Sequence, residues 1–221
     1  MPDAAPSRWP IVLLDWDNTL HDSATTHLTA LNGVLSAYGL TVSLDAYRRA
    51  YTIDYRLLYR RLGLKPELVS EASDRWRRQV AAAEPRLLPG AGEAVDLLVE
   101  TGRRVGLVTS GSHAIVEDQL ARLGLAGRFD AAVYGDGQPH RPDPAPLLQA
   151  LAILDAPATS AAFCSDTPVD MQMARLAGVY PVGLATFAFG PDELRAAGAQ
   201  EVAPSLAAWV EALLAEGGGS G

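Results

Sequence analysis

The sequence predicts an α/β protein with a Rossmann-like parallel sheet, helices on both faces of that sheet, and a helical insertion after its first strand. Short continuous apolar runs recur along the chain, which is typical of strands buried on both faces of a parallel sheet. From about residue 90 onward these runs alternate with helical patterns, as in repeated strand–helix–strand units. The stretch before residue 90 breaks this alternation, because after the first run it contains helix-like segments only.

The first strand is expected at residues 11–14, where the run IVLL follows Pro10 and ends at Asp15. The insertion that follows is predicted to contain helices and no strand, with helical segments at 26–38, 44–50, 55–62 and 67–83. Pro85, Pro89 and Gly90 mark its end, because proline and glycine interrupt regular helices.

The remaining strands of the sheet are expected at residues 105–109, 131–134, 161–164 and 179–184. Helices are expected at 92–100, 114–123, 146–154 and 168–177, and the last two begin with a proline, which fits the first turn of a helix. The predicted core domain therefore comprises residues 1–20 and 90–216, and the predicted helical domain comprises 21–89. The final GGGSG, residues 217–221, is expected to be a flexible tail.

Composition excludes several classes of protein. The chain has 18 Lys and Arg against 26 Asp and Glu, a formal net charge of -8, which argues against a nucleic-acid partner. It has no apolar run of about 18 residues and no secretory leader, so we expect a cytoplasmic protein without a membrane partner. Its one cysteine, Cys164, excludes an intrachain disulfide and a zinc site with several cysteines.

Two aspartates follow the first strand, in the segment LLDWDNTL. Asp15 and Asp17 are two residues apart, and their carboxylates converge if the chain turns at Asn18 and Thr19. Two carboxylates held so near each other repel unless a cation lies between them or one of them is protonated. The pair therefore predicts a divalent metal site or an acid–nucleophile pair, and the alternative is a solvated turn.

Two further segments of the core carry groups that could bind a phosphate: one carries hydroxyl groups and the other carries an arginine. Thr109 and Ser110 end a strand and precede a helix, where free backbone N–H groups and hydroxyls suit a phosphate; the alternative is simple capping of that helix. Arg141 lies in the proline-rich segment HRPDPAP and would present a fixed cation to phosphate oxygens; the alternative is a solvated surface arginine.

A second acidic pair follows the strand at 161–164, in the segment CSDTPVD. Asp166 and Asp170 are four residues apart, one helical turn on the same side. Hard oxygen ligands suit Mg²⁺, which binds few carboxylates and keeps waters or substrate oxygens. The alternative is ordinary use of aspartate at a helix start. In open α/β sheets ligands bind beyond the carboxyl ends of the strands, so we expect all four segments to meet at one site.

With these four motifs in order, the chain resembles the haloacid dehalogenase superfamily over residues 11–185. LLDWDNTL is similar to its DxDGT motif, VTS to its Thr/Ser motif, RPDP to its basic loop, and SDTPVD to its GDxxxD motif. The subgroup it resembles contains phosphoglycolate-phosphatase-like and β-phosphoglucomutase-like enzymes. In that family the insertion after the first motif is a mobile helical cap, which implies that residues 21–89 form a cap that selects the substrate.

The resemblance implies an Mg²⁺-dependent phosphatase that hydrolyses a small phosphomonoester, phosphoglycolate-like or a sugar phosphate, as a monomer or homodimer. It implies that Asp15 attacks the phosphorus to form a phosphoaspartyl intermediate and that Asp17 is the general acid and base. Asp15, Asp166 and the backbone carbonyl of Asp17 would hold Mg²⁺, with Asp170 supporting them. Thr109, Ser110 and Arg141 would bind the phosphate.

Three residues depart from the family pattern: Asn18 and Ser165 stand where the family has glycine, and Arg141 stands where it has lysine, with a longer and planar fork. Arg141 and Ser165 keep open the alternative of a non-catalytic phosphate-binding protein. The resemblance to the β-phosphoglucomutase-like enzymes keeps open a second alternative, a sugar-phosphate mutase of that type. In the cap, Arg56 lies near an arginine of related caps, and His27 is read as a partly exposed helical histidine.

Overall fold

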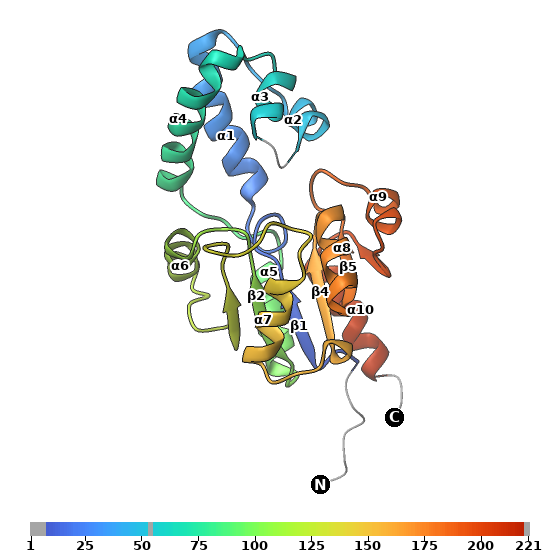
Figure 1. Cartoon of the computed structure of the whole chain (residues 1–221). Helices are drawn as coiled ribbons and strands as arrows, with labels where there is room; N and C mark the ends of the chain where they lie inside the picture. The colour runs from blue at the N-terminus through green and yellow to red at the C-terminus, as the bar shows by residue number, and fades with distance from the viewer. Residues whose placement is uncertain (1–7, 53–54, 219–221) are drawn as a thin grey trace. The chain divides into compact units, whose positions relative to one another are not determined.

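The computed structural model describes residues 8–52 and 55–218 (Figure 1). The chain divides into two compact units, one made of residues 1–21 and 87–221 and the other of residues 22–86. We call them the core unit and the cap unit and describe each by itself. No helix within the described ranges is long and apolar enough to cross a membrane.

The core unit contains a six-stranded sheet in which every neighbouring pair is parallel, in the order β3-β2-β1-β4-β5-β6. β1 lies in the middle and pairs with β2 and β4, so that Leu14 is level with Leu107 and Cys164. The carboxyl ends of β1, β2 and β4 therefore meet at one edge. The strands are β1 (Ile11–Leu14), β2 (Arg104–Val108), β3 (Ala131–Val133), β4 (Ala161–Ser165), β5 (Tyr180–Leu184) and β6 (Glu201–Ala203).

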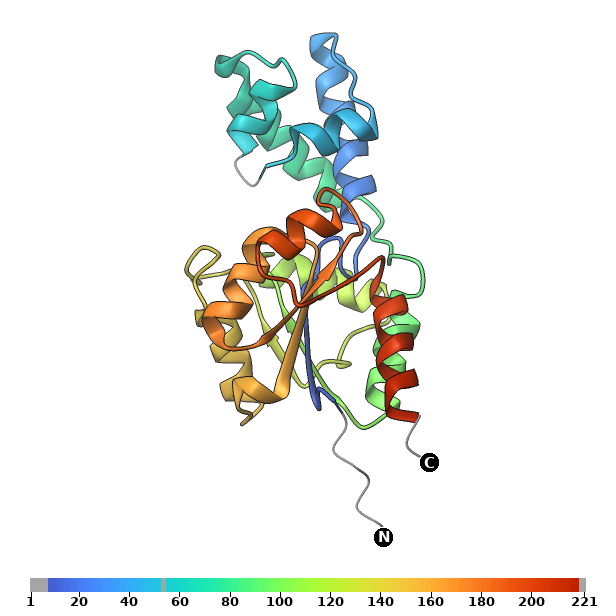
Figure 2. The same cartoon turned by 90° about the vertical axis from the view of Figure 1, so that its right-hand side faces the viewer.

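Helices cover both faces of this sheet (Figure 1). Alternate residues of β1 point to opposite faces, so Val12 and Leu14 join one apolar cluster while Ile11 and Leu13 join another. The first cluster includes α5 (Ala91–Glu100), α6 (His113–Arg122) and α10 (Leu206–Gly218), and α10 lies beside α5 (Figure 2). The second includes α7 (Ala145–Ile153) and α8 (Pro168–Ala177).

The predicted fold class is confirmed, and the predicted strands and helices of the core are present within a residue or two of the expected bounds. Four elements of the described core were not predicted: α9 (Pro191–Ala196), β6, α10 and a short 3₁₀ turn at Ala158–Ser160. α10 extends to Gly218, two residues into the segment expected to be a tail, and residues 219–221 lie outside the described residues.

The cap unit is helical, and its described residues contain no strand, as predicted. It consists of α1 (Ser23–Leu35), α2 (Leu44–Ala50), α3 (Tyr55–Arg61) and α4 (Val69–Ala82), with short 3₁₀ turns at Ser36–Tyr38 and Pro66–Leu68. α1 packs against α4, and the Trp76 indole N–H donates to the carbonyl of His27 at 3.1 Å. The His27 ring also meets the Trp76 ring edge-on, with centroids 4.9 Å apart, so His27 has a structural role in the cap.

Candidate functional site

The first motif turns sharply just beyond β1. Asp15 is 3% exposed, and its backbone N–H donates to the Cys164 carbonyl of β4 at 3.0 Å. The backbone N–H groups of Leu20 and His21 both donate to the Trp16 carbonyl, which closes the turn. Asn18 has φ 55°, in the left-handed region that asparagine tolerates better than most residues, so its replacement of the family glycine is accommodated.

His21 contacts the second aspartate of this motif. Its Nδ1 lies 3.4 Å from Asp17 Oδ1, and its ring stacks on Trp16 with centroids 5.4 Å apart. The His21 side chain is 2% exposed, whereas that of Asp17 is 40% exposed. Asp17 is therefore held from the buried side by the histidine while it remains open to solvent.

Two loops lie together beyond β2 and β3. Thr109 is buried and its Oγ1 accepts a hydrogen bond from the Gly111 N–H at 2.9 Å, whereas Ser110 is exposed. A Cβ added at Gly135 would lie 2.2 Å from the Ser110 carbonyl oxygen, so glycine is required for this approach. The Asp136 carboxylate accepts from the first N–H of α6, so that end is capped by an aspartate and not by a serine side chain.

The second acidic motif leads from β4 into α8. Asp166 is 2% exposed and Asp170 is not exposed at all. The Asp170 Oδ2 accepts hydrogen bonds from Ser165 Oγ and Thr167 Oγ1, each at 2.6 Å. Thr167 also caps α8, accepting from the Asp170 N–H at 3.3 Å.

Arg141 joins the two acidic motifs. Its Nη2 donates to Asp15 Oδ1 at 2.7 Å and to the Val108 carbonyl at 3.3 Å, while its Nη1 donates to Asp170 Oδ2. The Arg141 side chain is 15% exposed, so the solvated-surface alternative is wrong for this residue. The Arg141 guanidinium therefore contacts Asp15, the predicted nucleophile, although lysine is the usual residue at this position of the family motif.

Burial sets the ionisation of these groups. Burial raises the pKa of Asp15 to about 7. The Arg141 charge lowers this pKa and the Asp170 charge raises it, but burial has the largest effect. Burial raises the pKa of Asp166 well above its usual range, and Asp15 and Asp170 raise it further. For Arg141, burial lowers the pKa but the charges of Asp170 and Asp15 outweigh it, so its pKa is raised and it stays cationic.

These carboxylates have the chemistry of a hard-cation site. Asp166 Oδ2 and Asp170 Oδ1 are buried and accept no hydrogen bond within the described residues, although buried polar atoms are nearly always paired. A divalent cation would supply the missing partner for Asp166 and offset the repulsion among the carboxylates. Across residues 8–52 and 55–218 no group of three His, Cys, Asp or Glu side chains is arranged to hold a metal ion.

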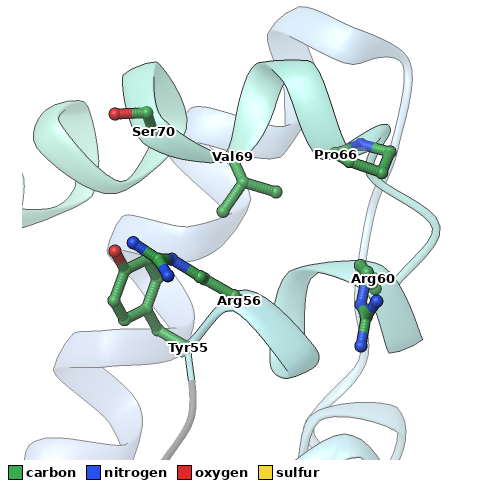
Figure 3. Close-up of a pocket in the computed structure, with 6 residues that line it drawn as sticks. All are labelled: Tyr55, Arg56, Arg60, Pro66, Val69 and Ser70. Atoms are coloured by element: carbon green, nitrogen blue, oxygen red, sulfur yellow. The ribbon is translucent and has the colours of Figure 1, made fainter.

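The cap unit contains a separate cationic pocket of about 360 Å³ (Figure 3). Arg56 lies against the face of Tyr55, with its Cζ 5.7 Å from the ring centroid. Figure 3 shows Val69 pointing toward these two side chains from α4. The pocket is lined by Tyr55, Arg56, Arg60, Pro66, Val69 and Ser70.

The fold and the motif order together define a class of protein: the chain belongs to the haloacid dehalogenase-like hydrolases, whose family pattern it matches over residues 12–184. It is similar to a phosphoglycolate phosphatase of Cupriavidus necator, with 32% identity over 209 residues covering 89% of this chain and 90% of that protein. The predicted family and the prediction of a hydrolytic enzyme are thereby confirmed.

Solved structures share the fold. A haloacid dehalogenase-like hydrolase from Streptococcus pneumoniae superposes with a TM-score of 0.76 at 20% identity, covering 93% of this chain and 97% of that one. CbbY from Rhodobacter sphaeroides, solved in complex with phosphate, superposes with a TM-score of 0.70 at 23% identity, covering 90% and 95% of the two chains.

The structure thus brings Asp15 and Arg141 into direct contact and places Asp166 just beyond β4, the strand that pairs with β1. Asp17 lies two residues after Asp15, and its charge contributes to the raised pKa of both Asp15 and Asp166. Thr109 and Ser110 lie at the end of the adjacent strand β2. Sequence reasoning assigned no role at the site to two contributors, His21 and Ser165. His21 directly follows the first motif and Ser165 stands within the last one, so their place in the chain was a signal that they lie near the site.

Proposed function

We propose that this protein is an Mg²⁺-dependent phosphatase that hydrolyses a small phosphomonoester through a phosphoaspartyl intermediate on Asp15. The observation that carries the proposal is the Arg141 fork, which joins the Asp15 carboxylate to Asp170 beside the buried Asp166. An ordinary surface aspartate has no such support, whereas a nucleophile must be held in one orientation.

In the first step, an Asp15 oxygen attacks the phosphorus and the bond to the ester oxygen breaks. Arg141 orients the attacking carboxylate through Oδ1, which leaves the second oxygen to face the substrate. Mg²⁺, held by Asp15, Asp166 and the backbone carbonyl of Asp17, would supply charge neutralisation between the carboxylates and the phosphate.

Asp17 is assigned the proton transfers. It gives a proton to the leaving oxygen and then takes one from the water that hydrolyses the acyl phosphate. Its half-open position suits this role because both the leaving group and water must reach it. The contact with His21 limits its rotation from the buried side.

The transferred group would be bound by Thr109, Ser110 and Arg141. The hydroxyls and the backbone N–H groups that follow β2 offer donors to its oxygens, and Arg141 adds a fixed positive charge. These side chains contact only the phosphoryl group, so they do not distinguish one phosphate ester from another.

Selection among esters is assigned to the cap unit. The relative from Cupriavidus necator is named a phosphoglycolate phosphatase, and we infer a substrate of that kind, small and carrying a second anionic group. The cationic cap pocket with Arg56 and Arg60 has the charge to recognise such a group.

The test is release of inorganic phosphate from 2-phosphoglycolate with and without Mg²⁺. Asp15→Asn should abolish Mg²⁺-dependent release, because an amide is a far weaker nucleophile. Asp118→Asn is the matched control, since Asp118 lies on α6 and its side chain is 62% exposed. Undiminished turnover in Asp15→Asn would remove the assignment.

The same assay separates the alternatives. With a hexose phosphate, a mutase isomerises the sugar without releasing phosphate, whereas a phosphatase releases it. A non-catalytic phosphate-binding protein would gain thermal stability with Mg²⁺ and phosphate and turn over no ester on a broad panel.

A further inference from the structure

Asp170 is the meeting point of three donors. Ser165 Oγ and Thr167 Oγ1 each donate to its Oδ2 at 2.6 Å, and Arg141 Nη1 donates to the same oxygen. Ser165 and Asp170 have no solvent exposure, so water does not compete for these bonds. Asp170 Oδ1 has no hydrogen-bond partner among the described residues, so the orientation of the carboxylate depends on what holds Oδ2.

Arg141 transmits that orientation to Asp15. The guanidinium is planar and rigid, so fixing Nη1 on Asp170 also fixes the direction of Nη2, which donates to Asp15 Oδ1 at 2.7 Å. A lysine has a single nitrogen on a flexible stem and does not couple two carboxylates through a rigid plane. The coupling is therefore a property of arginine at this position.

We propose that Ser165 is a positioning residue that sets the Asp15 nucleophile through Asp170 and the Arg141 fork. The proposal rests on the proposed function for its kinetic consequence. Ser165 and Arg141 both differ from the residues usual in the family motifs, and both donate to the same oxygen, Asp170 Oδ2. The two residues act together: the Ser165 hydroxyl orients Asp170, and Asp170 in turn orients the Arg141 guanidinium.

The test is a double-mutant cycle of wild type, S165A, R141K and S165A/R141K. In the arginine background S165A should lower kcat about tenfold, the size of a lost hydrogen bond to a charged group, with KM within about twofold. In the lysine background the same change should alter kcat by less than about twofold, because the fork is already gone. The matched control is S160A, since the Ser160 hydroxyl donates to the carbonyl of Pro157, three residues earlier in the same 3₁₀ turn.

Thermal unfolding of the same four proteins separates this inference from the proposed function. Coupling of Ser165 to Arg141 predicts that the double variant loses less stability than the sum of the single losses, whether or not the protein turns over an ester. If wild type has no turnover but the unfolding losses couple, the proposed function fails and the positioning role stands. If S165A has equal effects in both backgrounds, in turnover and in unfolding, Ser165 does not act through Arg141 and the inference is wrong.

Discussion

Removing Arg141 should destabilise the core in a way that depends on pH. Arg141→Ala takes away the cation that bridges Asp15 and Asp170, whose side chains are 5% and 0% exposed. Breaking a buried ion pair by removing one partner costs about 3–5 kcal/mol, because the remaining charge stays buried without its partner. For a chain of this length that loss corresponds to a decrease in Tm of roughly 6–20 °C.

The pH dependence follows from Asp15. Burial raises its pKa to about 7 in the folded protein, above the unfolded value of about 3.9, so the protonated form is favoured by folding. The stability contributed by protonated Asp15 is present at low pH and is lost as the pH rises toward 7. Because Arg141 lowers this pKa, its removal raises the pKa further, and the variant should lose more stability relative to wild type at pH 8 than at pH 5.

The assay is thermal and urea unfolding of metal-free wild type and variant, followed by circular dichroism at both pH values. Arg128→Ala is the control, because Arg128 forms a surface pair with Asp96 at 3.0 Å with both side chains more than 40% exposed. Its loss should be no more than about 1 kcal/mol and independent of this pH change. An Arg141→Ala loss as small as the control, or equal at pH 5 and pH 8, would refute the reasoning.

Three further predictions concern the metal, the phosphate loop and the cap. Asp166→Asn should raise the Tm of the metal-free protein, since burial opposes its charge, and should shrink the Tm increase on adding Mg²⁺; an unchanged Mg²⁺ response would exclude Asp166 as a ligand. Gly135→Ala should push against the Ser110 backbone, costing about 1–3 kcal/mol in urea unfolding and raising KM; a variant with wild-type stability and KM would show that the loop has room. Arg60→Ala should raise KM for 2-phosphoglycolate by about tenfold and leave KM for para-nitrophenyl phosphate unaffected. Arg75→Ala on α4, where Arg75 pairs with Glu71 and is 34% exposed, should change neither; equal kinetics in the two variants would exclude the cap pocket.

The sequence predicts most of the sheet because its strands are buried on both faces. β1 lies at the predicted residues, since all four side chains of IVLL are buried and the run is bounded by Pro10 and Asp15. β6 was missed because it begins with Glu201 and so has no apolar run, whereas β3, which is equally short and also lies at a sheet edge, has the apolar run AAV. α10 carried a usable signal: Leu206, Trp209, Val210 and Leu213 are spaced as one helical face and are all buried.

The part of the site that could be predicted consists of the residues that directly follow the strands. Asp15 and Asp166 follow neighbouring strands of the parallel sheet, so the expectation that they meet depends only on strand order. The Arg141 bridge depends on the path of the loop between β3 and α7, which no periodicity in the sequence encodes. The bond from Ser165 to Asp170 likewise depends on the geometry at which β4 enters α8.

The central claim is that Asp15 becomes covalently phosphorylated, and the most direct measurement is chemical trapping. Wild-type protein is mixed with 2-phosphoglycolate and Mg²⁺, quenched and treated with borohydride, which reduces an acyl phosphate to the alcohol, and the peptide that contains Asp15 is analysed by mass spectrometry. The account predicts reduction at Asp15 that requires both substrate and Mg²⁺. Reduction at Asp17, or at no residue during active turnover, would contradict it.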